Sequence, residues 1–287
     1  MKSALSFNNQ NSLVHDFGKF KLVLDKNDLD ISQQIKDSGW YKDEEYETKL
    51  FKKKLREGMR FLDLGANIGF YSIFARSIIG EKGLVISFEP FPKNANLIRK
   101  SVKLNRYDNV VVVEAAVSNK HGKAKLYLSP EYYTENSLID LEFTYPKNWK
   151  GQRAIDVKVI TIDDFLGKKI KNFCVDFIKM DIEGSEHKAL RGMKKTIEQN
   201  ESLALMTEFW PNGLIKNGSE PRDFLEHLAS LNFNLFSHMD NEYERIYQVT
   251  INQIMKTWKQ RSKTVLDEVM KNCDWYTNLL CVKKKKG

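Results

Sequence analysis

Residues 61–72 of this 287-residue chain read FLDLGANIGFYS, an apolar run that breaks at a glycine-containing turn and continues as a second apolar run. RFLDLG predicts a short buried strand, and FYSIFARSII, which Gly80 follows, predicts a helix. The alternation then continues, with predicted strands at 83–89, 109–118, 175–184, 202–210, 233–239 and 277–283 and predicted helices at 92–105, 185–199 and 221–232. This order predicts an α/β fold with a doubly wound, mostly parallel sheet.

The composition favours a folded protein with one large core. Hydrophobic residues make up 41% of the sequence, and no apolar stretch approaches the ~20 residues of a membrane span. The N-terminus lacks the apolar core of a signal peptide, and the cysteines fit neither a disulfide framework nor a metal-binding spacing. We therefore expect a soluble, cytoplasmic protein without a bound metal, and its oligomeric state stays open.

The formal net charge is +8, and the basic residues cluster. The clusters are FKKKLR (51–56), GMKKT (192–196), KTWKQRSK (256–263) and the terminal KKKK (283–286). Such clusters can attract nucleic acid or other anionic surfaces, but they also form ordinary solvated helix faces. Because no nucleic-acid motif accompanies them, the sequence favours solvated faces. A non-catalytic module that binds RNA or a partner protein is the weaker alternative.

The predicted elements divide the chain into two parts. Residues 1–50 form a mixed N-terminal cap, with a strand pattern in KFKLVLDKND and a helical pattern that starts in YKDEEYETKL. Residues 51–287 form the main domain, with insertions at about 129–155 and 243–275. The first insertion is polar and aromatic, and the second contains an amphipathic helical pattern. Insertions of this length in a compact domain are usually functional or disordered.

The turn after the first strand indicates which kind of ligand the fold holds. Dinucleotide folds carry Gly-x-Gly-x-x-Gly, and the second glycine lets a pyrophosphate approach the backbone. Here Asn67 takes that position between Gly65 and Gly69, although asparagine still tolerates left-handed backbone geometry. A carboxylate at Asp63 would repel a pyrophosphate but suits an ammonium group. The pattern therefore favours S-adenosylmethionine over a nicotinamide dinucleotide.

Glu89 ends the second strand, in SFEPFPKN. An acidic residue about 20 positions after the glycine turn is where a carboxylate accepts hydrogen bonds from the two hydroxyls of a ribose. Nicotinamide enzymes share this feature, so Glu89 indicates an adenosine ligand without choosing between cofactors. The neighbours of these residues complete the predicted cofactor site: Ala66, Tyr71, Pro90 and Asn94.

The chain resembles the FkbM-type methyltransferases, which are S-adenosylmethionine-dependent enzymes of the class I fold. The resemblance runs from about residue 20 to about residue 240. It rests on LDLGANIGFYS, FEPFPKNANLIRKSVKLN, VVEAAVSN, VKVITIDDF, FIKMDIEGSEHKALRG and LMTEFWP. It implies a seven-stranded sheet with an antiparallel last strand, and methyl transfer, usually to a hydroxyl. It also places the adenine at Glu114, Ala115 and Ala116, and the rest of the cofactor at Asp63, Gly65, Asn67, Gly69 and Glu89.

Ligands of open α/β sheets lie beyond the carboxyl ends of the strands, so the ends of strands four and five should meet the reacting group. Asp181 is the first candidate for a base, or for a group that binds the cofactor, and Glu208 is the second. Alternation places Lys179 and Glu183 on the same side as Asp181. The alternative is structural: Asp181 orders its turn and Glu208 pairs with a lysine. His187 is expected at the surface, and His121 and His238 have no partner spacing.

Aromatic and amide groups in the first insertion and after strand five suit a sugar or another polyhydroxyl acceptor. The candidates are Tyr132, Tyr133, Asn136 and Trp210. Ordinary loop packing is the alternative. We therefore predict an O-methyltransferase that acts on a hydroxyl of a sugar, glycan or secondary metabolite. Two other enzymatic interpretations stay open: an N-methyltransferase of a small molecule or peptide, and, less favoured, a nicotinamide-dependent oxidoreductase.

Overall fold

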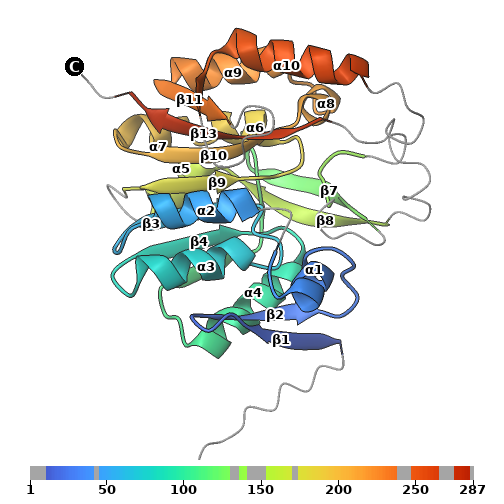
Figure 1. Cartoon of the computed structure of the whole chain (residues 1–287), viewed down its shortest axis with the longest axis vertical. Coiled ribbons are helices and arrows are strands. Elements are labelled where there is room, and N and C mark those ends of the chain that lie inside the picture. The colour runs from blue at the N-terminus through green and yellow to red at the C-terminus, as the bar shows by residue number, and fades with distance from the viewer. Residues whose placement is uncertain are drawn as a thin grey trace, which may run out of the picture.

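The computed structural model describes residues 11–41, 45–129, 136–140, 153–169, 174–237, 247–264 and 275–284. A central sheet lies between layers of helices, and a small second sheet projects from one side of it (Figure 1). The strands are β1 (Ser12–Asp16), β2 (Lys21–Asp25), β3 (Arg60–Leu64), β4 (Leu84–Phe88), β5 (Val110–Val113), β6 (Ala116–Val117), β7 (Gly122–Leu128), β8 (Arg153–Ile160), β9 (Phe177–Met180), β10 (Ala204–Phe209), β11 (Phe233–Ser237), β12 (Tyr247–Val249) and β13 (Thr277–Lys283). The helices are α1 (Ile31–Ser38), α2 (Glu45–Lys54), α3 (Phe70–Ile79), α4 (Pro92–Asn105), α5 (Ile162–Lys169), α6 (Glu186–Arg191), α7 (Lys194–Gln199), α8 (Pro211–Lys216), α9 (Pro221–Ser230) and α10 (Ile251–Thr264).

The main sheet has the strand order β12-β11-β13-β10-β9-β3-β4-β5. Strands β5, β4, β3, β9 and β10 pair in parallel, whereas β13 runs antiparallel to both of its neighbours, β10 and β11. This arrangement confirms the predicted seven-stranded, mostly parallel sheet with an antiparallel last strand. Strand β12, from the second predicted insertion, pairs antiparallel with β11 and adds an eighth strand at that edge.

The predicted strand 109–118 is divided between two sheets. Strand β5 belongs to the main sheet, and β6 belongs to a three-stranded sheet of order β6-β8-β7. The chain bends between them, where the Ala115 N–H donates to the Val113 carbonyl at 3.0 Å. The run VVVVEAAV (110–117), apolar except for Glu114, therefore contains a bend, because the hydrophobicity of a segment alone does not report a change of direction.

The predicted helix 185–199 is also divided, into α6 and α7. Gly192 lies between the two helices, where the backbone of the segment after β6 passes close by. A Cβ at residue 192 would lie 2.0 Å from the Ser118 carbonyl oxygen. This close approach requires a residue without a side chain. Ser185 occupies the N-cap position of α6 as predicted, but its side chain makes no capping hydrogen bond.

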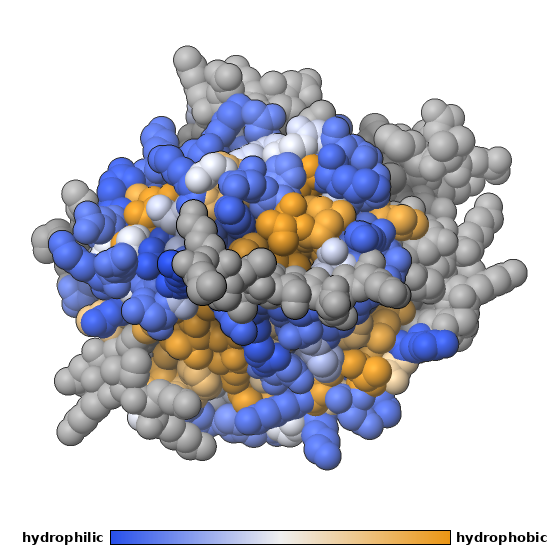
Figure 2. Space-filling model, turned by 90° about the horizontal axis from the view of Figure 1, so that it is seen from below, coloured by the Kyte–Doolittle hydropathy of each residue, from blue (hydrophilic) through white to orange (hydrophobic). Residues whose placement is uncertain are grey.

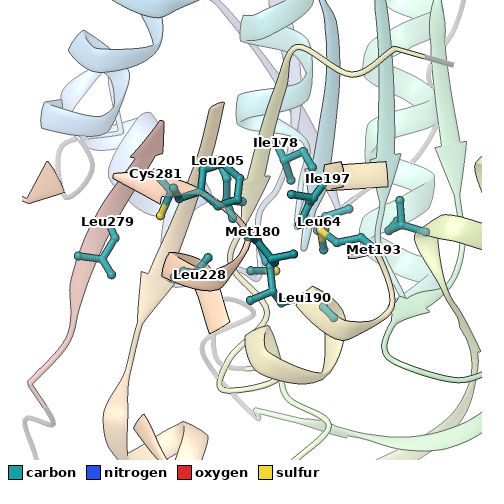
Figure 3. Close-up of a cluster of buried hydrophobic side chains, with 14 of the residues drawn as sticks. Leu64, Ile178, Met180, Leu190, Met193, Ile197, Leu205, Leu228, Leu279 and Cys281 are labelled. Carbon is teal, nitrogen blue, oxygen red and sulfur yellow. The ribbon is translucent and has the colours of Figure 1, made fainter. Parts of the chain in front are cut away.

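Each face of the main sheet has its own hydrophobic core. Leu62 and Leu64 of β3 contribute to the core against α6, α7 and α9, and Figure 3 shows how Leu190, Met193 and Leu228 meet the strands there. Phe61 points to the opposite face, into the core that α2 and α3 share. Each buried leucine or phenylalanine stabilises the fold by about 1.5–3 kcal/mol. The two-residue period therefore assigns Asp63 to the α2–α3 face.

The N-terminal segment packs onto this second core. Its hairpin β1–β2 is fastened to α4, where the Val23 N–H donates to the Ser101 hydroxyl at 2.9 Å. The ring of Trp40 lies 5.7 Å from that of Phe70, at the start of α3. Figure 2, which views the molecule from the hairpin end, shows apolar patches broken up by hydrophilic residues. None of the helices in the described part of the chain has the length and apolar character needed to cross a membrane.

Candidate cofactor and active site

Strand register places the predicted site residues at one end of the main sheet. Asp63 of β3 is level with Ser87 of β4 on one side and with Lys179 of β9 on the other. Glu89, Gly65 and Asp181 come directly after the last residues of these three strands, Phe88, Leu64 and Met180. Glu208 of β10 lies two residues beyond the partner of Lys179, directly opposite Asn278 of β13. The carboxyl ends of four neighbouring parallel strands, β4, β3, β9 and β10, thus bring these groups together, as predicted, and the first residues of the antiparallel β13 lie beside them.

The glycine turn is tightly packed against the end of β9. Gly65 has a φ of +83°, and a Cβ there would lie only 1.8 Å from the Asp181 carbonyl oxygen. Asn67 adopts a left-handed φ of +49°, as its side chain permits. Gly69 has a φ of +90° and forms the N-cap of α3. The turn therefore brings backbone N–H groups and the end of β9 to the same place.

Replacing Gly65 by alanine should destabilise the protein by about 2–5 kcal/mol, because a clash with backbone adds to the cost of positive φ. Gly58 supplies the matched control, since its φ is +81° and nothing lies within 4 Å of its virtual Cβ. Gly58→Ala should cost only about 1–2 kcal/mol. Urea unfolding measures both values. Equal losses would show that φ alone, and not the approach of β9, requires glycine at residue 65.

Glu89 is buried beside the turn, with its carboxylate oriented by backbone. One oxygen accepts the Asn67 N–H at 2.8 Å, and the other accepts the Phe91 N–H at 2.8 Å. Burial raises the pKa of Glu89 to about 8, against the opposing effect of these two hydrogen bonds. A carboxylate held in this way keeps further lone pairs for two hydroxyl donors.

Asp63 is fully buried and partly satisfied by protein groups. Its Oδ2 accepts the Ser72 hydroxyl at 2.6 Å, and the Ser72 hydroxyl also lies 2.6 Å from that of Ser87. Its Oδ1 has no hydrogen-bond partner among the described residues. Burial raises the pKa of Asp63, while the ammonium of Lys179 acts to lower it.

The remaining predicted cofactor residues differ in their placement. The Asn94 side chain donates to the Asn67 side-chain oxygen at 2.9 Å, and Asn94 Oδ1 is another buried acceptor without a partner in the described part of the chain. Tyr71 is buried, with the Lys179 ammonium 4.9 Å from its ring centre. Glu114, in contrast, lies at the surface and pairs with Arg99 at 2.9 Å. Four predicted residues with apolar side chains complete the set: Ala66, Ala115 and Ala116, which are buried, and Pro90, which is partly buried.

The donor groups of S-adenosylmethionine match these acceptors. Its ammonium, ribose hydroxyls and adenine amino group are donors, and buried acceptor atoms of Asp63, Glu89 and Asn94 surround the turn. Burial of an unpaired acceptor costs about 1–3 kcal/mol, so unsatisfied oxygens at a site indicate a missing donor. The residues present therefore fit this cofactor.

Two carboxylates and a lysine lie at the ends of β9 and β10, where the sequence places the reacting group. Lys179 is buried, and its ammonium lies 2.7 Å from Asp181 Oδ2. Glu208 keeps some solvent exposure, but its Oε2 is enclosed and has no partner among the described residues. Burial raises the pKa of Glu208 well above its usual value, and the negative charges of Glu183, Asp181 and Glu186 raise it further. Asp181 is thus committed to an ion pair, whereas Glu208 is suited to accept a proton.

The strand alternation that the sequence predicted ends before Glu183. Strand β9 stops at Met180, and Glu183 adopts a left-handed φ of +52° in the following turn. Its carbonyl accepts the Ser137 hydroxyl at 3.0 Å, so part of the first predicted insertion reaches this turn. Glu183 therefore lies near Asp181 because of the turn, not because of an extended strand.

The predicted acceptor-binding residues are only partly described. Trp210 is buried and packs with Ile139 and Tyr127, next to the end of β10. The Asn136 side-chain oxygen accepts the Ser129 N–H at 3.0 Å, and its Nδ2 is buried without a partner in the described residues. Tyr132 and Tyr133 lie outside the described residues. The insertion thus reaches the end of β10 through residues 136–140.

Two expectations about histidines are wrong. His187 is 3% exposed, and its ring centre lies 5.5 Å from that of His227, because the first turn of α6 faces α9 rather than solvent. Burial lowers the pKa of His187 to about 4, and the positive charge of Arg191 lowers it further. His121 has a partner after all, since its Nε2 lies 2.5 Å from Asp164 Oδ2. His238 lies outside the described residues.

The sequence did not indicate several polar residues of the site. Ser72 was within reach of sequence reasoning, since it lies in the first turn of the helix above Asp63. Asn278 donates to Glu47 of α2 at 3.0 Å, and only the antiparallel register of β13 reveals this contact beside Glu208. A separate hollow of about 270 Å³ lies between α9 and α10 and contains none of the predicted site residues; it is lined by Arg222, Asn252, Met255, Lys256, Lys259 and Gln260.

Comparison with curated proteins finds methyltransferases. Protein-L-isoaspartate O-methyltransferase 1 of Archaeoglobus fulgidus is 37% identical over 59 residues, covering 21% of this chain and 27% of that protein. Methyltransferase 1 of Beauveria bassiana is 23% identical over 143 residues, covering 46% of this chain and 57% of that protein. The chain thus matches about a quarter and somewhat more than half of the lengths of these relatives.

Among solved structures, a SAM-dependent O-methyltransferase of Thermotoga maritima is 13% identical with a TM-score of 0.42, covering 88% of this chain and 71% of that chain. TYW2 of M. jannaschii, in complex with AdoMet, is 11% identical with a TM-score of 0.43, covering 97% of this chain and 89% of that chain. The profile of the methyltransferase FkbM domain matches residues 63–243, which is more than half of the chain and includes the glycine turn and both candidate bases. The chain therefore belongs to the methyltransferase FkbM domain family, a family of S-adenosylmethionine-dependent methyltransferases, as the sequence motifs predicted.

Proposed function

We propose that the protein transfers a methyl group from S-adenosylmethionine to a hydroxyl oxygen of a sugar, glycan or secondary metabolite. The observation that carries this proposal is the position of Glu208, two strands away from the glycine turn, with a raised pKa and an Oε2 that has no hydrogen-bond partner among the described residues. A neutral hydroxyl must lose its proton as it attacks, and a nearby base contributes typically about 10²- to 10⁴-fold.

The cofactor supplies an electrophilic methyl group and a thioether leaving group when it is bound. Glu89 and the backbone of the glycine turn hold the adenosine end, and Asp63 and Asn94 provide acceptors around the turn. Glu208 would take the proton that the acceptor hydroxyl loses as its oxygen receives the methyl group. The ammonium of Lys179 lies 2.7 Å from Asp181 Oδ2. This ion pair would fix a second carboxylate near the acceptor.

N-methylation is the second candidate. Among the charged groups that act on Glu208 in the described part of the chain, the carboxylates of Asp181, Glu183 and Glu186 outnumber the ammonium of Lys179, and such an excess of carboxylates attracts ammonium groups. An amine bound as ammonium would also need to give its proton to Glu208 before it could attack. Family membership favours either methyl transfer over hydride transfer to a nicotinamide.

Incubation with S-adenosylmethionine carrying a labelled methyl group should transfer the label to a polyol or glycan acceptor in a panel that also contains amines and RNA. The expected product gains one methyl group on oxygen, as shown by mass spectrometry after mild base treatment, to which ethers are stable. Transfer only to amines would replace the first candidate with the second. Absence of S-adenosylhomocysteine binding in calorimetry would contradict both.

A further inference from the structure

Glu186 is a buried carboxylate that the proposed reaction does not use. It is the first residue of α6 and is fully inaccessible to solvent. Its Oε1 accepts the N–H of Ile182 at 2.9 Å, and its Oε2 has no partner among the described residues. A buried charge of this kind is expensive and needs an explanation.

The turn that Glu186 contacts is the one that follows Asp181. Glu183 and Gly184 both have positive φ values, +52° and +84°. A Cβ at residue 184 would lie 2.7 Å from the backbone of Gly213, so the turn has no room to relax in that direction. A non-glycine residue in the left-handed region persists only where its surroundings impose it.

Other residues fasten the carbonyl side of this turn. The Asn217 side chain donates to the Gly184 carbonyl at 3.1 Å, and the Ser137 hydroxyl donates to the Glu183 carbonyl at 3.0 Å. These side chains act as donors, so they cannot bind a backbone N–H group, which needs an acceptor. The carboxylate of Glu186 supplies the acceptor for the Ile182 N–H, immediately after Asp181 in the chain.

We infer that Glu186 is a positioning residue, whose buried carboxylate fixes the turn that carries Asp181 and Glu183 and thereby sets the electrostatic field at Glu208. The role of that field rests on the proposed function, whereas the anchoring of the turn does not. The contact of Oε1 with the turn and the burial of both oxygens carry the inference.

The charge of Glu186 should also affect the reaction. The charge of Asp181, on the same turn, acts on Glu186, and Glu186 together with Asp181, Glu183 and Lys179 acts on Glu208 of β10. Burial raises the pKa of Glu186 to about 7, and the negative charge of Asp181 raises it further. Ionised Glu186 in turn raises the pKa of Glu208. As the pH rises through about 7, Glu186 therefore becomes a stronger acceptor for the turn and makes Glu208 a stronger base.

Two substitutions separate position from charge. Glu186→Ala removes the acceptor, and Glu186→Gln keeps an oxygen for the Ile182 N–H but removes the charge. Glu198→Gln is the control, because Glu198 is an exposed glutamate on α7 that pairs with Lys194. Each variant is measured for kcat between pH 5.5 and 9, for S-adenosylhomocysteine affinity, and for amide hydrogen exchange at residues 182–184.

Glu186→Ala should lower kcat by about 10- to 100-fold, because a displaced turn misplaces Asp181, and should leave the cofactor affinity within about threefold. It should also speed exchange of the 182–184 amides at least about tenfold more than that of the β3 and β10 amides. Glu186→Gln should retain the protection of the 182–184 amides from exchange and most of kcat. Its kcat should no longer fall as the pH is lowered through about 7. Glu198→Gln should behave as the unmodified protein.

Unchanged kcat and exchange in Glu186→Ala would overturn the inference, as would a uniform rise in exchange across all strands. If that variant fails to fold, Glu186→Gln decides: an unchanged acidic limb near pH 7 overturns the role of the charge. If the protein shows no methyl transfer at all, the exchange data still test the anchoring of the turn. Failure of the proposed function is therefore distinguishable from failure of this inference.

Discussion

Replacing Glu89 by glutamine should weaken binding of S-adenosylhomocysteine by about 10²- to 10³-fold. The carboxylate is already oriented by two backbone N–H groups, so its remaining lone pairs would accept the ribose hydroxyls at no further ordering cost. A hydrogen bond to a charged group contributes about 1.5–3 kcal/mol, and a ribose makes two. Glutamine has the same shape, but it presents an amide NH₂ where one oxygen was. Isothermal calorimetry at pH 7.5 measures the loss.

The same site should make cofactor binding depend on pH. Glu89 has a pKa of about 8 in the free protein, and hydrogen bonds from the ribose favour its ionised form. Affinity should therefore rise by up to about tenfold per pH unit as the pH approaches 8, with release of a proton on binding. Calorimetry at pH 7 in two buffers with different ionisation enthalpies detects that proton. Glu89→Gln should lose both effects.

Glu114→Gln is the matched control for Glu89→Gln. Glu114 was also predicted at the cofactor, but its carboxylate lies at the surface in an ion pair with Arg99. Exposed pairs contribute about 0.2–1 kcal/mol, so the affinity should change by less than about fivefold. A loss at Glu114 as large as the loss at Glu89 would mean that the ribose carboxylate has been misassigned.

Some of the site was readable from the sequence because it depends on local pattern. The glycine turn and Glu89 follow directly from strand ends, and strand ends follow from short apolar runs with turn residues after them. Parallel strands place their carboxyl ends at one edge, so Asp63, Asp181 and Glu208 were expected together and are found together. Asn67 adopts a left-handed conformation, which the sequence showed to be permitted for asparagine at this turn.

Other features could not be read because they depend on contacts between distant segments. The turn after β9 is shaped by Gly213 and Asn217, which belong to or follow α8. The burial of His187 depends on where α9 packs. The position of His187 in the α6 sequence does not show whether that side of the helix faces solvent or another helix. Asn278 joins the site through the antiparallel register of β13, some 70 residues after Glu208. The spacing of residues in the sequence does not show how two strands so far apart in the chain align with each other.

Replacing Glu208 by glutamine should lower kcat by about 10²- to 10⁴-fold, the usual contribution of a general base, and should leave cofactor affinity nearly unchanged. The sequence ranked Asp181 ahead of Glu208, but the structure pairs Asp181 with Lys179 at 2.7 Å and leaves Glu208 Oε2 free among the described residues. Asp181→Asn is therefore the comparison, and its effect on kcat should be the smaller of the two. Labelled methyl transfer at pH 8 under saturating cofactor measures both.

Loss of activity in Glu208→Gln should not come from unfolding. The pKa of Glu208 is raised in the folded protein, so its ionisation makes stability fall as the pH rises from its unfolded pKa to its folded one. Glutamine cannot ionise, and the variant should be at least as stable as the unmodified protein at pH 8 in urea unfolding. A stable Glu208→Gln variant with full activity, beside an inactive Asp181→Asn variant, would move the role of base to Asp181, because only an ionisable group can take the proton that the hydroxyl loses.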